Sequence, residues 1–174
     1  MMRSTLVLAL ILGLCTGCSS CSGQKKAEEQ QRQQTEDIIE ANRRILEEEA
    51  RLIDEYIEKH SLDMVKSRTG LRYAIRETGS GPKPTDGQVV LIDYESFFLD
   101  DSNLGPAGTS QMVIRVNQDY TIRGLVEGVQ MMRVGDSAKF ILPSHLAYGM
   151  QGVPGEIPRR ATVIFDVTLT AINE

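Results

Sequence analysis

Two patterns of apolar and polar positions divide the chain, the first helical and the second alternating. From about Glu28 to Lys59 there is no Gly or Pro, and the residues are mainly Glu, Gln, Arg, Ile, Leu and Ala, which favour a helix. The apolar residues of this segment recur in pairs, mostly seven residues apart: Ile38/Ile39, Ile45/Leu46, Leu52/Ile53 and then Tyr56/Ile57. This spacing predicts a long helix with one apolar stripe.

The apolar stripe is expected to be buried, and the sequence leaves two partners open. The helix could pack on the protein's own domain, or it could pair with a second copy or another partner. The stripe covers fewer than three heptads, which is short for an independent coiled coil. Its length does not decide between packing on the protein's own domain and pairing with a partner.

After a break at residues 67–70, five segments alternate apolar and polar residues and predict strands. Their apolar positions are Leu71/Tyr73/Ile75, Val90/Ile92/Tyr94, Met112/Ile114/Val116, Ala138/Phe140/Leu142 and Val163/Phe165/Val167/Leu169. One short helical window interrupts them at residues 124–132. The pattern predicts an α+β domain in which a five-stranded antiparallel sheet with one buried face curves around a short helix.

Composition agrees with one globular domain and an appendage. The chain has 174 residues, of which 41% are apolar and 25% charged. It carries 19 Lys and Arg against 24 Asp and Glu, a net charge of −5, so we expect no nucleic-acid partner. Residues 24–65 hold 7 basic and 12 acidic side chains, which marks the helical segment as a distinct acidic arm.

Candidate chemistry is sparse outside the N-terminal region. All three cysteines, Cys15, Cys18 and Cys21, lie there, so the rest of the chain has neither a disulfide nor a thiol nucleophile. The two histidines, His60 and His145, are isolated, and His145 is interpreted as a loop histidine. No phosphate-binding loop, nucleophile elbow or carboxylate pair is present, so we expect neither a metal nor a cofactor.

The N-terminus has the pattern of a secretory signal peptide. A basic start is followed by the nine-residue apolar run Leu6–Leu14. This run is too short to span a bilayer, which needs a helix of about 20 residues. Thr16, Gly17 and Cys18 then resemble the lipobox of bacterial lipoproteins, with Cys18 as the lipidated residue. Ser19 after it implies, by the same resemblance, the outer membrane. The alternative is a plain signal peptide that leaves Cys18 and Cys21 free or paired.

These patterns divide the chain into four predicted regions. Residues 1–17 form the signal peptide, 18–27 the lipidated cysteine and a flexible tether, 28–66 the helical arm, and 67–174 the globular domain.

Three motifs in the globular domain carry a family resemblance. They are YTIRGLVEGVQMMRVGD at residues 120–136, PSHLAYG at 143–149 and PGEIPRRATVIFDV at 154–167. In these motifs the chain resembles the FK506-binding-protein family of peptidyl-prolyl isomerases, from about Gly70 to the C-terminus. The arm is similar to those of secreted bacterial members, among which the lipoprotein isomerases associated with gliding motility are the most similar.

The resemblance implies a substrate pocket between the sheet and the short helix. Its catalytic residues would be Tyr94, Ile122, Tyr148 and Phe165, and its substrate-binding residues Met112, Thr121, Leu125 and Ile157. In this scheme the Ile122 N–H donates to a substrate carbonyl, the Tyr148 hydroxyl lies at the rim and Leu125 forms the floor. For each apolar member, simple core packing is an equally good interpretation.

Two departures from the family pattern stand out. The floor is commonly Trp, and this chain has none. The usual Phe-Asp pair has no clean match, since Leu99-Asp100 and Asp101-Ser102 are both candidates for it, so Asp100 and Asp101 both remain candidates for the acidic pocket residue.

The implied function is isomerisation of X-Pro bonds in exported polypeptides, by a lipid-anchored protein of the cell envelope that faces the periplasm. Such catalysis needs no metal, nucleophile or general base. The alternative is a noncatalytic chaperone or an assembly module of an envelope complex, possibly one for gliding motility. The arm leaves a homodimer open as a further possibility.

Overall fold

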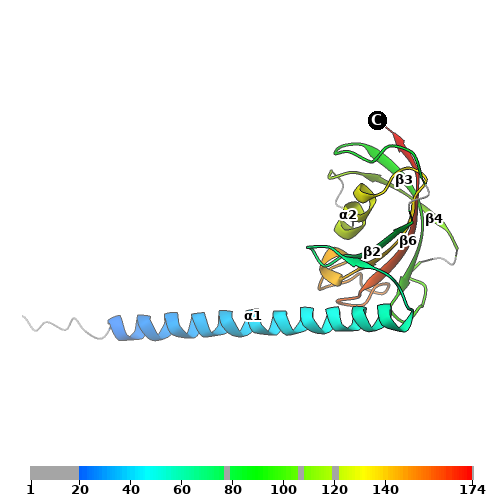
Figure 1. Ribbon diagram of the computed structural model, residues 1–174. Coiled ribbons are helices and arrows are strands. Elements are labelled where there is room, and N and C mark those ends of the chain that lie inside the picture. Colours follow the sequence, from blue (N-terminus) through cyan, green and yellow to red (C-terminus); the bar gives the residue numbers. More distant parts are fainter. Residues whose placement is uncertain (1–19, 77–78, 106–107, 119–121, 174) are drawn as a thin grey trace, which may run out of the picture. The chain divides into compact units, whose positions relative to one another are not determined.

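The computed structural model describes residues 20–76, 79–105, 108–118 and 122–173, with side chains from residue 25 onward. Their elements, in chain order, are α1 (Ser20–Lys59), β1 (Val65–Lys66), β2 (Arg72–Arg76), β3 (Val89–Phe98), β4 (Ser110–Arg115), α2 (Arg123–Met131), β5 (Ser137–Leu142), the 3-10 turn η1 (Ser144–Leu146) and β6 (Val163–Asn173) (Figure 1). The chain forms two compact units, residues 1–44 and residues 45–174.

The strands of the second unit form one antiparallel sheet in the order β1-β2-β5-β6-β3-β4, which curves around α2 (Figure 1). The five predicted strands and the short helix are all present, so the predicted α+β architecture is confirmed. The two-residue strand β1 is an addition that the alternation did not predict, because two residues are too few to show a period.

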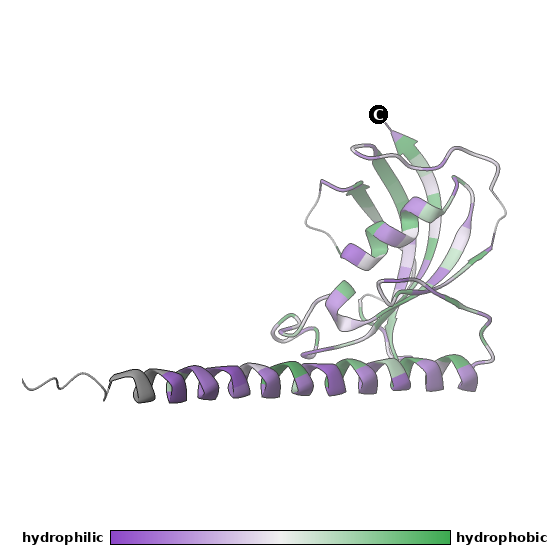
Figure 2. Cartoon of the chain, turned by 60° about the vertical axis from the view of Figure 1, so that its left-hand side comes forward, coloured by the Kyte–Doolittle hydropathy of each residue, from purple (hydrophilic) through white to green (hydrophobic). Residues whose placement is uncertain are grey.

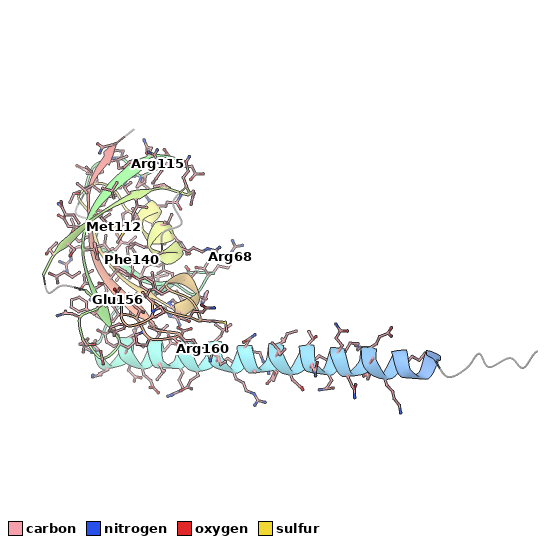
Figure 3. The ribbon with its side chains drawn as sticks, turned by 180° about the vertical axis from the view of Figure 1, so that it is seen from behind. Arg68, Met112, Arg115, Phe140, Glu156 and Arg160 are labelled. Atoms are coloured by element: carbon pink, nitrogen blue, oxygen red, sulfur yellow. The ribbon has the colours of Figure 1, made fainter. Side chains whose placement is uncertain are left out.

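The main core lies between α2 and the concave face of the sheet. Phe140 on β5 and Leu125 on α2 are fully buried in it. Gly128 permits this close packing, because a Cβ atom there would lie 2.7 Å from the Phe140 ring. Gly124 does the same toward Leu142, at 2.8 Å. Figure 3 shows the labelled Phe140 on the sheet beside α2. The glycines of the helix thus set how near it lies to the sheet.

Helix α1 ends where the sequence predicts but begins earlier. It starts at Ser20 rather than Glu28, so residues 20–27, predicted to form a flexible tether, are helical. Good helix formers at residues 25–28 favour the later part of this extension, whereas Ser, Cys and Gly at residues 20–23 do not. After Lys59 the helix closes with Ser61 in the left-handed region (φ 51°) and the Leu62 N–H donating to the Ile57 carbonyl at 3.0 Å, as at many helix C-termini.

The apolar stripe of α1 is buried only toward its C-terminal end. Ile53 and Tyr56 are 0% and 9% exposed and pack on Ile141 and Ile164, on the convex face of the sheet. Ile45 and Ile57 are half-buried, and the remaining members of the stripe are exposed in the single chain: Ile38, Ile39, Leu46 and Leu52. Burial of these four would need a partner, and so it stays a prediction. Figure 2 shows hydrophobic positions recurring along α1 among hydrophilic ones. Within the described residues, no helix combines the length and the apolar character needed to cross a membrane.

Candidate functional site

Two aromatic side chains from neighbouring strands form the centre of the candidate site. Tyr94 on β3 pairs in register with Val167, and Phe165 lies two residues before Val167 on β6, so both rings project from the same face. The ring centroids are 5.8 Å apart and the planes are tilted by 47°. This tilted arrangement is favourable for an aromatic pair and forms a wall of apolar surface.

Most of the predicted site residues belong to one apolar cluster on the concave side of the sheet. Its buried members include Leu125 and Phe165, and partly buried side chains pack against it, among them Tyr94, Met112, Ile122 and Tyr148. Figure 3 shows the labelled Met112 on the sheet side of this region. Leu125 is 0% exposed, so in this structure the predicted floor position is part of the packed core.

Ile122 occupies the N-cap position of α2. Its carbonyl accepts hydrogen bonds from the amides of Leu125 (3.0 Å) and Val126 (3.1 Å), and no side chain caps the helix. The first amides of a helix have no partner within the helix and carry a partial positive charge. The site therefore includes a helix N-terminus suited to a carbonyl oxygen. Thr121, also predicted to contact substrate, lies outside the described residues.

Tyr148 follows η1 in a tight turn. The Ser144 carbonyl accepts hydrogen bonds from the amides of Ala147 (3.0 Å) and Gly149 (2.7 Å), on either side of Tyr148. Burial raises the pKa of the Tyr148 hydroxyl, and the neighbouring Tyr94 and Glu156 raise it further. The hydroxyl is therefore protonated at neutral pH and available as a hydrogen-bond donor.

Ile157 lies apart from the cluster. Its side chain is buried, and its amide and carbonyl form hydrogen bonds of 2.8 Å and 3.0 Å with the backbone of Val153. The structure thus brings six of the predicted site residues together and leaves Ile157 outside their cluster.

Both candidates for the acidic pocket residue have partners elsewhere. Asp101 accepts a hydrogen bond of 2.7 Å from the Tyr56 hydroxyl on α1. Asp100 accepts hydrogen bonds from the hydroxyl and the amide of Ser102, which lower its pKa. Neither carboxylate is directed to the cluster by these contacts.

Sequence reasoning missed one residue in this region, Leu104. It packs against the core cluster, and its amide donates to the Ser96 carbonyl at 2.9 Å, which holds it beside β3. A single apolar residue in a loop rich in Gly and polar residues has no periodic signal, so the pattern could not reveal it. The residue after Leu104 is Gly105, so this position does not supply the acidic pocket residue either.

A cavity lies on the other face of the sheet. It has a volume of about 720 Å³, and polar side chains alternate along its strands. Lys139 and Asp166 pair across β5 and β6 at 2.6 Å within it. The charged side chains along this cavity do not suit a proline ring, which an apolar pocket accommodates better. The part of the chain that the structure describes has no group of three His, Cys, Asp or Glu side chains that could hold a metal.

Comparison with protein families assigns the domain that carries this cluster. Residues 81–170 match the model of the FKBP-type peptidyl-prolyl cis-trans isomerase. This region contains the strands β3 to β5, helix α2 and most of β6, and thus both aromatic rings of the site.

Several known proteins are similar to the chain. The FKBP-type isomerase FkpA of Escherichia coli K12 is 34% identical over 121 residues, 68% of this chain and 44% of FkpA. FK506-binding protein 1 of Gibberella zeae is 34% identical over 110 residues, 60% of this chain and 99% of that protein. The crystal structure of E. coli FkpA superposes with a TM-score of 0.61 at 29% identity and covers 90% of this chain and 74% of that one.

The chain therefore spans less than half the length of the curated FkpA sequence that it matches. The family match covers β3, β4, β5 and β6 as far as Thr170. From the family match over residues 81–170 and the similarity to FkpA, the chain belongs to the FKBP-type peptidyl-prolyl cis-trans isomerase family.

Proposed function

We propose that this protein catalyses cis-trans isomerisation of X-Pro bonds in exported polypeptides. The observation that carries the proposal is the Tyr94–Phe165 ring pair on the concave side of the sheet, in the same apolar cluster as a protonated Tyr148 hydroxyl. An apolar wall suits a proline ring, and the hydroxyl and the N-terminus of α2 supply donors for the peptide carbonyls.

The reaction needs only binding and desolvation. Rotation about an X-Pro bond has a barrier of about 18–20 kcal/mol, because the planar amide loses its resonance when it twists. The twisted amide has a smaller dipole than the planar one, so an apolar surrounding favours it relative to water. Substrate carbonyls would meanwhile accept hydrogen bonds from the Ile122 amide and the Tyr148 hydroxyl. No covalent step is required.

A protease-free isomerisation assay on an X-Pro peptide tests this proposal. The unmodified protein should exceed the uncatalysed rate, and Tyr94→Ala should reduce kcat/KM by removing half of the ring pair. Asp93→Ala is the matched control, because Asp93 precedes Tyr94 on the same strand and projects from the opposite face. Turnover at background level in a folded protein would refute the enzymatic function.

We further propose that the protein works in the cell envelope, facing the periplasm and anchored through lipid on Cys18. The apolar run before the lipobox-like Thr16-Gly17-Cys18 supports this, and these residues lie outside the described part. Cys18→Ala should abolish lipid labelling and release the protein from the membrane fraction. Unchanged membrane retention of this variant would count against the anchor.

One observation favours a second function, that of a noncatalytic chaperone or assembly module. Ile38 and Ile39 on α1 are 61% and 62% exposed, which is unusual for a pair of adjacent isoleucines. They could hold a client or a partner, including one in a gliding-motility complex. Suppression of client aggregation by a protein that is inactive in the peptide assay would support this function over the enzymatic one.

A homodimer is a third part of the proposal. The same exposed isoleucines form one stripe with Leu46, and a second copy of α1 would present the same stripe in return, as a twofold interface requires.

A further inference from the structure

A buried carboxylate on α1 binds both ends of one loop of the domain. Glu49 is 8% exposed. One of its oxygens accepts hydrogen bonds from the Ser144 amide (2.6 Å) and the Thr162 hydroxyl (2.9 Å), and the other accepts from the Ser144 hydroxyl (3.1 Å). Ser144 and Thr162 are also buried, at 5% and 7%. Three donors from two distant points of the chain thus converge on one side chain.

These two points bound the loop that carries Tyr148. Ser144 begins η1, and its carbonyl holds the amides on both sides of Tyr148. Thr162 immediately precedes β6, which carries Phe165. A displacement of Ser144 or Thr162 would therefore move residues of the candidate site. The hydrogen bonds of Glu49 go to Ser144 and Thr162 rather than to the residues of that site, so its effect would act through the loop.

Attachment of α1 to the domain does not by itself require a carboxylate here. Ile53 already packs on the sheet, and Asp54 forms a 2.8 Å ion pair with the buried Arg72. Burying a charge costs free energy unless hydrogen bonds replace its hydration, and an apolar side chain would serve docking equally well. What the carboxylate adds is a fixed geometry for three donors at the base of the loop.

We propose that Glu49 is a positioning residue for the isomerase site, because it fixes the 144–162 loop and so the place of the Tyr148 hydroxyl. The inference rests on the isomerase function proposed above. It gives helix α1 a role in keeping the residues of the site in place, through the single side chain of Glu49.

The first test compares Glu49→Gln with two controls on the same helix. The amide keeps the shape but supplies one acceptor oxygen in place of two, so kcat/KM should fall by roughly three- to tenfold, as expected for weakened charge-assisted hydrogen bonds. Glu48→Gln changes an exposed carboxylate one residue away, and Asp54→Asn weakens a different polar attachment of α1, the ion pair with Arg72. Both controls should stay within about twofold of the unmodified protein.

A second measurement reports loop order without relying on catalysis. Hydrogen exchange at the Ala147 and Gly149 amides should accelerate in Glu49→Gln, while the amides of β5 and β6 keep their protection. Thr162→Val removes one donor without changing side-chain shape, and should show a smaller change of the same kind. This variant also keeps the test available if a harsher substitution at Glu49 does not fold.

The outcomes separate this inference from the function on which it rests. An unmodified protein without turnover would refute the isomerase function. Turnover in Glu49→Gln equal to that in Glu48→Gln would overturn the positioning role and leave the function intact. An equal loss in Asp54→Asn would also overturn it, because general loosening of α1 would then explain the effect.

Discussion

The hydroxyl of Tyr56 on α1 donates a 2.7 Å hydrogen bond to the carboxylate of Asp101, in the turn that follows β3. The contact joins residues 45 positions apart and places Asp101 against the arm. It also shields the hydroxyl from water, and this burial together with the Asp101 charge raises the pKa of Tyr56 well above its ordinary value.

The raised pKa of Tyr56 predicts a loss of stability in alkaline solution. Below about pH 10 both the folded and the unfolded state keep the proton. Above it the unfolded chain ionises first while folded Tyr56 does not, so the free energy of unfolding falls as the pH rises toward the folded pKa. Denaturant titrations between pH 8 and about pH 11 should show this decline, and Tyr56→Phe should decline less steeply.

At neutral pH the same variant should lose about 1 kcal/mol of stability, from the missing hydrogen bond to Asp101. Asp100→Ala is a suitable comparison, since Asp100 binds only its own turn through Ser102. Parallel alkaline profiles for the unmodified protein and Tyr56→Phe would contradict the assignment of the decline to Tyr56.

The Tyr148 hydroxyl is expected to contribute to catalysis as a neutral donor. Tyr148→Phe keeps the ring and removes the donor, so kcat/KM for an X-Pro peptide should fall by about five- to tenfold, the value of one hydrogen bond. Because burial raises its pKa, the activity of the unmodified protein should not titrate with this group between about pH 6 and pH 9. Activity of Tyr148→Phe equal to that of the unmodified protein would remove the hydroxyl from the mechanism.

We expect a Trp at the predicted floor position, Leu125, to lower stability rather than to strengthen inhibitor binding. Leu125 is fully buried in the core cluster with Val129 and Met132, so the larger indole of Leu125→Trp would overpack it and cost about 1–3 kcal/mol. Thermal unfolding should show a lower Tm, and affinity for a macrolide inhibitor of the family should not improve. Tighter inhibitor binding at unchanged Tm would show instead that Leu125 lines an open cavity.

The exposed isoleucines of α1 predict a change in oligomeric state. Replacing Ile38 and Ile39 by Lys removes apolar surface from a proposed helix pair, so analytical ultracentrifugation should detect a dimer for the unmodified protein and a monomer for this double variant. Gln33→Lys with Gln34→Lys, on the same helix, adds the same charge without removing apolar surface and should preserve the dimer. A monomer in every case would refute the homodimer.

The sequence alone determined the architecture of the domain, for a physical reason. Alternation with a period of two at Val90, Ile92 and Tyr94, or at Phe165 and Val167, is a local property that only a half-buried strand satisfies. The end of α1 at Lys59 and the short helix α2 were also predictable from local sequence, because helix-forming residues and their spacing are local properties. The family motifs likewise pointed to residues that the structure does bring into one cluster.

Only the tertiary structure decided which apolar and acidic residues meet which partners. Burial of Ile53 but not of Ile38 depends on where the sheet surface lies along α1, and the two residues look alike in the helical pattern. Asp101 contacts the arm through a residue 45 positions away, and no local pattern contains that contact. In the sequence, nothing distinguishes Glu49 from the other acidic residues of the charged helix. Its role follows from contacts 95 and 113 residues away, which no local pattern contains.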